Sequence, residues 1–512
     1  MRNNFLNWFF VVEVVLFSLI ITGVLPRETA LYLGVAFIIY FLMVPIEDSL
    51  VFFVRSIPLF LAMPFTADFD NFNVWRILAI IIFLKWFTAK FLIFNPPTGR
   101  QFSIKSQFSK LKNLLKPSIS PSFFLIVLLL LTVLSIIPAP DKVVAIKRII
   151  FFLNFSLFGI VIYYKAVDKE FTLRLIKNSI IPVVIVAAVG YIQVISTYFI
   201  DIYQFMRIWG EGIQCRQFGE QWCNIAVQLG NTWFAYYGEQ LSLRVFSLFP
   251  DSHSFPQFVL LGIPAVLAIT QKRWIRITSL SLLFLITILS GTRGIWAASV
   301  GVALLAFTLM WWIKRTAIEK EGGIVFKNIT AYLIIFFLAF SVAFPIFSSP
   351  QFLIGKSDDI LKARIRSILD FGETSNAQRI EIWKKTLSSI KEKPFLGVGI
   401  GNYPVVLEQD IRLAKAGSSA HNLYLQIASE MGILAGLIFI WFLWLLFKKN
   451  YEVFVREGDK RLGIYFAATL LYVPWILIYS LTDIAIFDER ALLMFMFTMA
   501  LILGRKNSPR DE

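Results

Sequence analysis

The sequence predicts an all-α polytopic integral membrane protein with about 12–14 transmembrane helices and a large extracytoplasmic loop that contains short helices. Of its 512 residues, 57% are hydrophobic and only 16% are charged, whereas a soluble domain carries about 25% charged residues. The mean hydropathy is +0.71. Apolar runs of about 20 residues, the length that crosses a bilayer, recur along the chain. This composition excludes a disordered protein, a disulfide-rich secreted domain and a cytosolic enzyme.

The apolar runs predict about fourteen membrane helices. We place them near 6–25, 29–45, 50–66, 74–94, 122–138, 146–164, 175–198, 254–270, 275–290, 294–313, 328–347, 423–447, 462–482 and 487–504. The first run has no A-x-A cleavage site, so we expect a retained helix rather than a signal peptide.

The distribution of positive charge predicts the orientation. The net charge is +16, from 49 Lys and Arg against 33 Asp and Glu. Basic clusters fall in short loops beside apolar runs and in the tail, at 95–121, 271–276, 314–327, 448–461 and 505–510, whereas loops 67–73 and 483–487 have no Lys or Arg. Under the positive-inside rule both termini are cytoplasmic. The basic charge therefore does not point to nucleic acid.

The same map divides the chain into five segments. They are an N-terminal transmembrane bundle at 1–198, an extracytoplasmic loop at 199–253, central transmembrane helices at 254–347, a large extracytoplasmic loop at 348–422, and C-terminal transmembrane helices with a cytoplasmic tail at 423–512. In the larger loop, Arg379, Ile382 and Trp383 have helical spacing. Pro394 and the glycines that follow it end that helix.

Cys215 and Cys223, the two cysteines, lie in the first extracytoplasmic loop. Two cysteines cannot form a disulfide framework. They form one small disulfide if the loop faces an oxidising compartment, or remain two free thiols. The sequence leaves both alternatives open.

Both histidines of the chain, His253 and His421, fall at the predicted extracytoplasmic surface. His421 precedes a membrane helix in the segment Ser418–Leu425. The positive end of that helix disfavours imidazolium, so a neutral ring that accepts a proton is expected there. The alternative is an interfacial histidine that caps the helix. His253 also precedes a helix, in the segment Phe249–Ser254, and is the weaker candidate.

Arg244, Arg293 and Arg379 are the candidate anion-binding residues. Arg244 precedes the segment with His253, Arg293 lies in a tight turn between two apolar helices, and Arg379 begins the helix of the large loop. The planar guanidinium matches phosphate oxygens and stays charged at any relevant pH. The alternative is an arginine that reaches toward lipid headgroups.

Glu13 and Lys85 are ionisable residues inside predicted membrane helices, where charge is costly. They lie about eight and nine residues from the inner ends of their helices, so their matched depth predicts a structural ion pair. A proton path is the alternative.

Asp68 and Asp70 form a D-x-D pattern in an extracytoplasmic loop, a pattern that some membrane glycosyltransferases use to bind a metal. No acidic cluster surrounds it. P-loop, G-x-G-x-x-G, H-E-x-x-H and nucleophile-elbow motifs are absent from the sequence. We therefore expect no metal, no cofactor and no nucleotide-driven chemistry.

Several motifs follow one another in order between about residues 240 and 445. They are Arg244–Ser247, Thr292–Gly294, Arg379-x-x-x-Trp383, Pro394–Gly399 and Ala420–Leu425, then Glu430–Ile433 with Gly436. In this order and spacing the chain resembles the O-antigen ligase and polymerase superfamily of bacterial envelope proteins.

This resemblance implies an enzyme that moves a glycan from an undecaprenyl diphosphate carrier to an acceptor hydroxyl at the extracytoplasmic face of the inner membrane. Ligases use the lipid A core of lipopolysaccharide, polymerases use a second carrier-bound chain, and relatives use protein or another envelope acceptor, so the expected acceptor is a glycolipid or other envelope acceptor. The resemblance further implies that His421 matches the catalytic histidine of the family. It also implies that Arg244 and Arg379 match the two essential arginines. His253 matches no motif of the family.

The chemistry of the residues agrees with metal-independent, inverting transfer. Arginines stabilise a leaving diphosphate as a metal would, and a neutral histidine takes the acceptor proton. A polymerase of O-antigen, capsule or exopolysaccharide remains an alternative, because it needs the same donor site. A small-anion transporter would need repeated halves and helices broken at mid-membrane, which the sequence does not clearly show.

Overall fold

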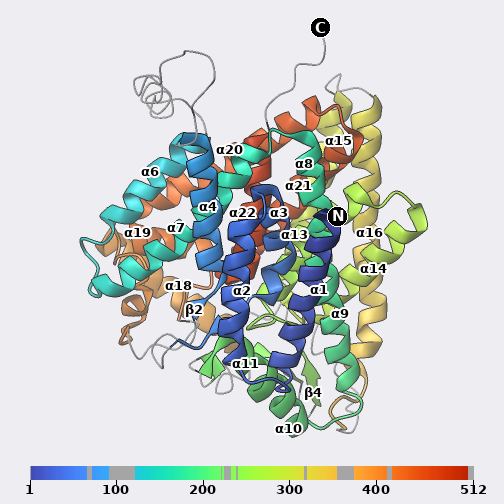
Figure 1. The fold of residues 1–512 in the computed structure, drawn as a ribbon. Helices are drawn as coiled ribbons and strands as arrows, with labels where there is room; N and C mark the ends of the chain where they lie inside the picture. The colour runs from blue at the N-terminus through green and yellow to red at the C-terminus, as the bar shows by residue number, and fades with distance from the viewer. Residues whose placement is uncertain are drawn as a thin grey trace.

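The computed structural model describes residues 2–65, 72–91, 121–220, 222–223, 232–237, 240–315, 320–353, 374–411 and 418–505. These residues are predominantly helical (Figure 1). The strands form two short antiparallel pairs, β1 (Ala62–Met63) with β2 (Phe72–Asn73) and β3 (Phe234–Tyr237) with β4 (Gln240–Leu243). The predicted all-α class is confirmed.

The helices follow the apolar runs of the sequence. In the first half they are α1 (Arg2–Ile21), α2 (Thr29–Met43), α3 (Ile46–Ser56), α4 (Trp75–Phe91), α6 (Pro121–Leu134), α7 (Lys142–Lys165), α8 (Lys169–Asn178), α9 (Ile180–Ser196), α10 (Ile202–Phe205) and α11 (Cys215–Phe218). In the second half they are α13 (Ser254–Ile269), α14 (Arg273–Leu289), α15 (Arg293–Arg315), α16 (Lys320–Ser348), α18 (Thr374–Glu392), α19 (Leu423–Met431), α20 (Ile433–Arg456), α21 (Lys460–Tyr479) and α22 (Glu489–Gly504).

By length and composition, seven spans in the described part of the chain can cross a membrane. They are Asn4–Ile21, Lys142–Lys165, Lys169–Ser196, Arg293–Ile313, Phe326–Ser348, Ile433–Arg456 and Lys460–Tyr479. Three shorter apolar helices are α2, α6 and α13. The architecture is that of a multi-pass membrane protein.

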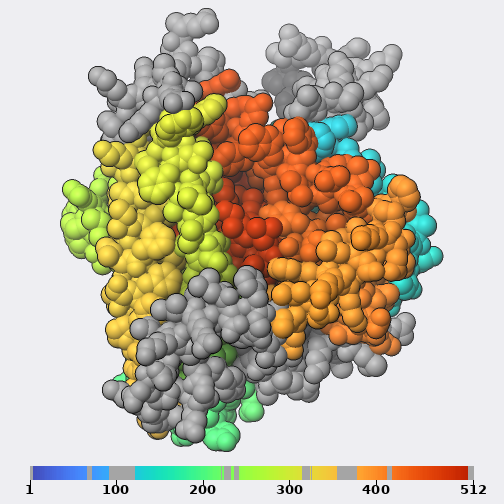
Figure 2. All heavy atoms as spheres, turned by 180° about the vertical axis from the view of Figure 1, so that it is seen from behind, coloured from blue at the N-terminus to red at the C-terminus, as the bar shows by residue number. Residues whose placement is uncertain are grey.

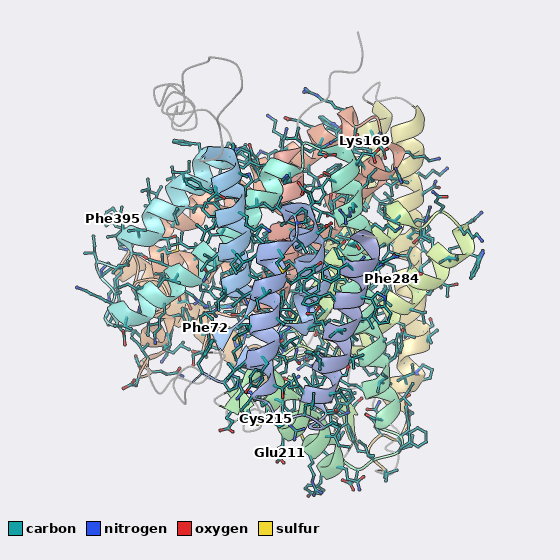
Figure 3. The ribbon with its side chains drawn as sticks, viewed as in Figure 1. Phe72, Lys169, Glu211, Cys215, Phe284 and Phe395 are labelled. Atoms are coloured by element: carbon teal, nitrogen blue, oxygen red, sulfur yellow. A yellow bond between two sulfur atoms is a disulfide. The ribbon has the colours of Figure 1, made fainter. Side chains whose placement is uncertain are left out.

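The two ends of the bundle differ in chemistry. One end, here called the basic end, carries Lys169 (Figure 3), which pairs with Asp459 at 3.0 Å. The opposite end, here called the disulfide end, carries Glu211 and Cys215 (Figure 3). The sulfur atoms of Cys215 and Cys223 are bonded there. The structure thus favours the disulfide over two free thiols.

The predicted helix at 50–66 is replaced by a shorter one. Helix α3 has 11 residues, about half of what a bilayer requires. It begins at the basic end, where Asp48 pairs with Arg174 at 2.7 Å. The chain after Ser56 contains Pro58, which favours the 3₁₀ turn Ile57–Leu59 over a continued helix. Non-helical backbone is tolerated at membrane depth where protein covers it, and residues 57–63 are all buried.

Two other predicted helices are each divided in two. The run at 175–198 falls in α8 and α9, which meet at Ser179. The run at 423–447 falls in α19 and α20, which meet at Gly432 with a φ of +91°. A Cβ at Gly432 would lie 2.0 Å from the carbonyl oxygen of Phe395, so the site requires glycine. A Cβ at Gly436 would lie 3.1 Å from the Cβ of Ala428. Helix α19 therefore folds back against the start of α20.

The predicted ion pair between Glu13 and Lys85 is wrong. Glu13 is buried and accepts a hydrogen bond from the hydroxyl of Ser56. Lys85 donates to the backbone carbonyls of Phe41 and Val44, at the end of α2. Matched depth in two helices does not make them neighbours around the bundle.

Helix α13 lies at the centre of the bundle, and all but one of its residues are buried. It packs on α21, α14, α22 and α9, and Figure 1 shows it surrounded by other helices. Its first residue, Ser254, follows His253. The central helix therefore holds the turn with His253 in a fixed place relative to the end of α21.

Candidate active site

Three charged or titratable side chains form a chain of hydrogen bonds at the start of α13. The Nη2 of Arg244 lies 2.9 Å from the Nε2 of His253. The Nδ1 of the same ring lies 2.7 Å from the Oδ2 of Asp483. These residues come from the end of β4, the turn before α13 and the turn after α21, so the fold joins segments that are more than two hundred residues apart in sequence.

The backbone around Arg244 is fixed by buried polar contacts. The amide of Arg244 donates to the carbonyl of Trp233 at 2.9 Å. Ser247, three residues on, has a φ of 53°, an uncommon conformation for a residue with a side chain. Its amide donates to the Oε1 of the buried Gln193 at 2.7 Å. These contacts set the direction in which Arg244 leaves the backbone.

The turn with Arg293 packs against this segment. Gly291 has a φ of +65°, and a Cβ there would lie 3.0 Å from the Cγ of Arg244. The hydroxyl of Thr292 donates to the carbonyl of Ser252 at 2.7 Å. Arg293 is half-buried at the start of α15. The structure thus places Arg293 in the turn beside Arg244 and the His253 segment.

Helix α18 brings Arg379 to the same region. Trp383, one turn after Arg379, donates from its indole Nε1 to the carbonyl of Ala420 at 2.9 Å. Arg379 is half-buried, and its Nε is buried without a hydrogen-bond partner among the described residues. Its charge acts on both His421 and Asp483. Arg379 is therefore part of the same electrostatic cluster as the residues of α13 and α21.

His421 lies in a strained turn just before α19. Its φ is 46°, in the left-handed region that side chains rarely occupy, and such strain clusters at functional sites. Its Nδ1 is buried and has no hydrogen-bond partner in the described part of the chain. Burial lowers the pKa of His421 below its usual 6.5; Arg379 and His253 lower it too, while Asp483 opposes them. The ring is therefore neutral at pH 7 and able to accept a proton.

Helix α19 is capped and tied to the turn after α21. The Oδ1 of Asn422 accepts hydrogen bonds from the amides of Tyr424 and Leu425, both at 3.0 Å. Its Nδ2 donates to the carbonyl of Leu481 at 2.9 Å. Because Leu481 lies two residues before Asp483, the turn with His421 and the turn with Asp483 are held together.

Asp483 is the negative centre of the cluster and is only 8% exposed. Burial alone would raise the pKa of its carboxyl. The electrostatic interaction and hydrogen bond with His253, with smaller contributions from His421 and Arg379, instead hold that pKa well below its usual range. Asp483 is therefore ionised at any pH at which the protein is studied.

An apolar groove begins beside this cluster and runs along the membrane helices. Figure 2 shows a hollow between yellow-green α15 and orange α20, with the darker red C-terminal helices at its floor. Its wall includes Leu305, Trp444 and Val473. Tyr424 and Leu481 also line it, and they lie within three residues of His421 and Asp483. An apolar chain in the groove would thus have one end at the cluster.

No group of three or more His, Cys, Asp or Glu side chains that could hold a metal occurs among the described residues. Asp68 and Asp70, the D-x-D pattern, lie outside them. The positive charge of the site comes from arginine side chains.

The structure brings together Arg244, Arg379 and His421, with Arg293 in the adjoining turn. Sequence reasoning ranked His253 low, and it did not identify Asp483 or Tyr479, whose hydroxyl lies 3.1 Å from the Nδ1 of His253. One signal was available for His253: both histidines of the chain stand just before a helix on the same predicted side.

The comparison with protein families agrees with the resemblance seen in the motifs. The model of a family described as O-antigen ligase matches residues 278–440. This range contains Arg293, Arg379 and His421, whereas Arg244, His253 and Asp483 lie outside it. No curated protein matches the chain. The match at residues 278–440 supports the O-antigen ligase superfamily and points to a membrane enzyme of glycosyltransferase type.

Proposed function

We propose that the protein is an O-antigen ligase-like glycosyltransferase that moves a glycan from an undecaprenyl diphosphate carrier to an acceptor hydroxyl. The acceptor is the lipid A core or another envelope glycolipid. The observation that carries the proposal is the cluster of Arg244, Arg379 and His421 around Asp483, at the end of an apolar groove.

The groove suits the polyprenyl tail of the carrier. Its lining is apolar apart from a few polar groups, and Asn450 and Thr469 satisfy each other there with a hydrogen bond of 2.9 Å. A tail in the groove, packed on Trp444 and Val473, leaves its headgroup beside Tyr424 and Leu481. The diphosphate of the donor then lies at the arginine cluster.

The arginines would bind the diphosphate and stabilise it as it leaves. Two negative charges develop on the leaving group when the bond to the anomeric carbon breaks. Guanidinium groups that are positioned in advance lower the energy of this charge separation. Arg244 follows β4 and Arg379 lies on α18, so the two arginines come from different segments and are proposed to contact different phosphate oxygens. Arg293 is proposed as a further ligand from the adjoining turn.

His421 is proposed as the general base. The acceptor hydroxyl must lose its proton as it attacks, and a neutral imidazole with a free nitrogen can take it. The buried Nδ1 of His421, without a hydrogen-bond partner among the described residues, is such a nitrogen. Direct attack on the face opposite the diphosphate inverts the anomeric centre. No metal or cofactor takes part in this mechanism.

The proposal places the site on the extracytoplasmic face of the bacterial inner membrane. The cluster lies on the segments that precede α13 and α19, and the basic residues Lys165 and Lys169 lie at the other ends of neighbouring helices. In a positive-inside orientation the basic end is cytoplasmic. The donor headgroup and the acceptor then meet in the periplasm or at the cell exterior.

The decisive test measures glycan transfer from purified polyprenyl diphosphate-glycan by the protein in nanodiscs. His421→Ala should lower transfer by about 10²–10⁴-fold and leave donor binding, measured separately, nearly unchanged. Leu387→Ala, an exposed substitution on α18, is the matched control. Full transfer by folded His421→Ala would refute the proposed base. Products with many added repeat units would instead indicate a polymerase.

A further inference from the structure

The proton of the His253 ring can be located from its partners. Arg244 carries only donors, so the Nε2 that faces it at 2.9 Å must accept and carries no proton. The proton therefore resides on Nδ1. That nitrogen lies 2.7 Å from the Oδ2 of Asp483 and 3.1 Å from the hydroxyl of Tyr479. His253 is thus the neutral Nδ1–H tautomer, bonded on both sides.

Asp483 and His253 resemble the Asp–His pair of a general base, but the Nε2 that would accept the proton is already in contact with Arg244. A carboxylate that accepts from Nδ1–H holds an imidazole in one tautomer and orientation. In a general base the Nε2 would face an acidic proton of the substrate. Here it faces a guanidinium that cannot give up its proton at any relevant pH. The partners of His253 therefore favour the orientation of Arg244 over proton transfer.

We propose that His253 is a positioning residue that aims the guanidinium of Arg244 at the donor diphosphate, with Asp483 holding the ring. The inference rests on the proposed function and assigns a role to a residue outside the motifs of the family. The Nε2 of His253 contacts the guanidinium itself, and the stem of Arg244 packs beside Gly291.

The surroundings of His253 support this role. Its side chain is 21% exposed and that of Asp483 is 10% exposed, so water competes little for these hydrogen bonds. The amide of His253 donates to the Oδ1 of Asp251 at 2.8 Å, which fixes the backbone of the turn. The charged or titratable groups around His253 are Arg244, Asp251, Tyr479 and Asp483, with His421 and Arg379 also acting on the cluster.

Two conservative variants separate the two hydrogen bonds of the ring. In His253→Gln the amide oxygen can take the place of Nε2 and accept from Arg244. In His253→Asn the amide nitrogen can take the place of Nδ1 and donate to Asp483, but the side chain is too short to reach Arg244. His253→Ala removes both contacts.

The experiment measures donor binding and turnover for these three variants in nanodiscs. If His253 aims Arg244, His253→Ala and His253→Asn should weaken donor binding about tenfold or more, since a hydrogen bond to a charged group is lost. His253→Gln should recover most of that loss. Lost turnover with unchanged donor binding in all three would overturn the inference and make His253 the base. Donor binding equal to that of wild type in both His253→Gln and His253→Asn would also overturn the inference.

A second measurement does not depend on transfer. Because the chain has two histidines, ring ¹⁵N labelling gives two sets of signals, and His421→Ala assigns them. The ring of His253 should show the Nδ1–H tautomer, and Arg244→Gln should release it. An Nε2–H tautomer would overturn the inference. Wild-type protein that transfers no glycan would refute the proposed function, whereas active wild type with the wrong tautomer refutes only the role of His253.

Discussion

The indole Nε1 of Trp383 donates a hydrogen bond to the backbone carbonyl of Ala420 at 2.9 Å, and this contact joins α18 to the turn that contains His421. Arg379 lies one helical turn before Trp383 on the same helix. The carbonyl of Ala420 belongs to the residue that precedes the strained His421. The single hydrogen bond therefore helps to set the separation between the proposed diphosphate ligand and the proposed base.

Trp383→Phe tests this link. The substitution keeps an aromatic ring in the same place and removes the donor, at a cost of about 1 kcal/mol. A loss of that size in the transition state lowers transfer roughly fivefold. Folded yield and thermal stability in detergent should change little. Transfer equal to that of wild type would show that the contact does not hold the two residues in register.

Arg244→Lys and Arg379→Lys test how the site holds the diphosphate. Lysine keeps the positive charge but loses the planar fork that binds two oxygens at once. We expect each variant to lose at least tenfold in donor affinity, and Arg244→Lys also to lose its geometry with His253. Titration with a short-chain polyprenyl diphosphate measures this, and Lys384→Arg on the exposed face of α18 is the control. Wild-type affinity in both lysine variants would mean that charge alone is sufficient.

Much of the fold could be predicted from the sequence because hydropathy reports burial in lipid directly. The runs at 29–45, 254–270 and 462–482 lie within a few residues of α2, α13 and α21. Helix breaks were harder to predict. Gly432 interrupts an apolar run where the carbonyl of Phe395 approaches it, a contact between two segments that the sequence alone does not pair.

The candidate site was predictable in part. His421 and Arg379 stand in motifs that carry a family resemblance, so their sequence context was sufficient to select them. Asp483 stands in a short turn with no motif. It belongs to the site because its carboxylate contacts the ring of His253, which lies 230 positions earlier in the sequence. A hydrogen bond between such distant positions has no signature in a single sequence. The error over Glu13 has the same origin, since depth in the membrane leaves the neighbouring helix undefined.

Glu13 and Lys85 now carry a revised prediction. Because they have different partners, the double variant Glu13→Gln/Lys85→Met should not recover what Lys85→Met loses. Lys85→Met removes the donor that binds two carbonyls of α2, so folded yield should fall. Glu13→Gln keeps an acceptor for Ser56 and should be tolerated. A double-mutant cycle compares the size-exclusion profiles and thermal stability of the two single variants and the double variant. A clear recovery in the double variant would support the ion pair between Glu13 and Lys85.

Metal independence is tested by chelation. If arginines supply the positive charge at the leaving diphosphate, transfer should persist in excess EDTA. Asp68→Ala/Asp70→Ala should likewise keep transfer within about twofold of wild type, an effect well below 1 kcal/mol. Loss of transfer with chelator, and its recovery with Mg²⁺ or Mn²⁺, would favour a metal at the D-x-D pattern instead.

The pH dependence of transfer tests His421 as the base. Because burial lowers the pKa of His421 below 6.5, the neutral ring persists to a lower pH than in an ordinary histidine. Transfer is lost as pH falls through that lowered pKa, so the acid limb of kcat/KM should have its midpoint below 6.5. Asp483 is already ionised over this range and should add no limb. Since its negative charge raises the pKa of His421, Asp483→Asn should move the limb of the residual activity to still lower pH. Because His253 lowers the pKa of His421, His253→Gln should keep the limb but move it to higher pH, which separates the two histidines. A midpoint at or above 6.5 in wild type, or a limb that disappears in His253→Gln, would assign the proton acceptor elsewhere.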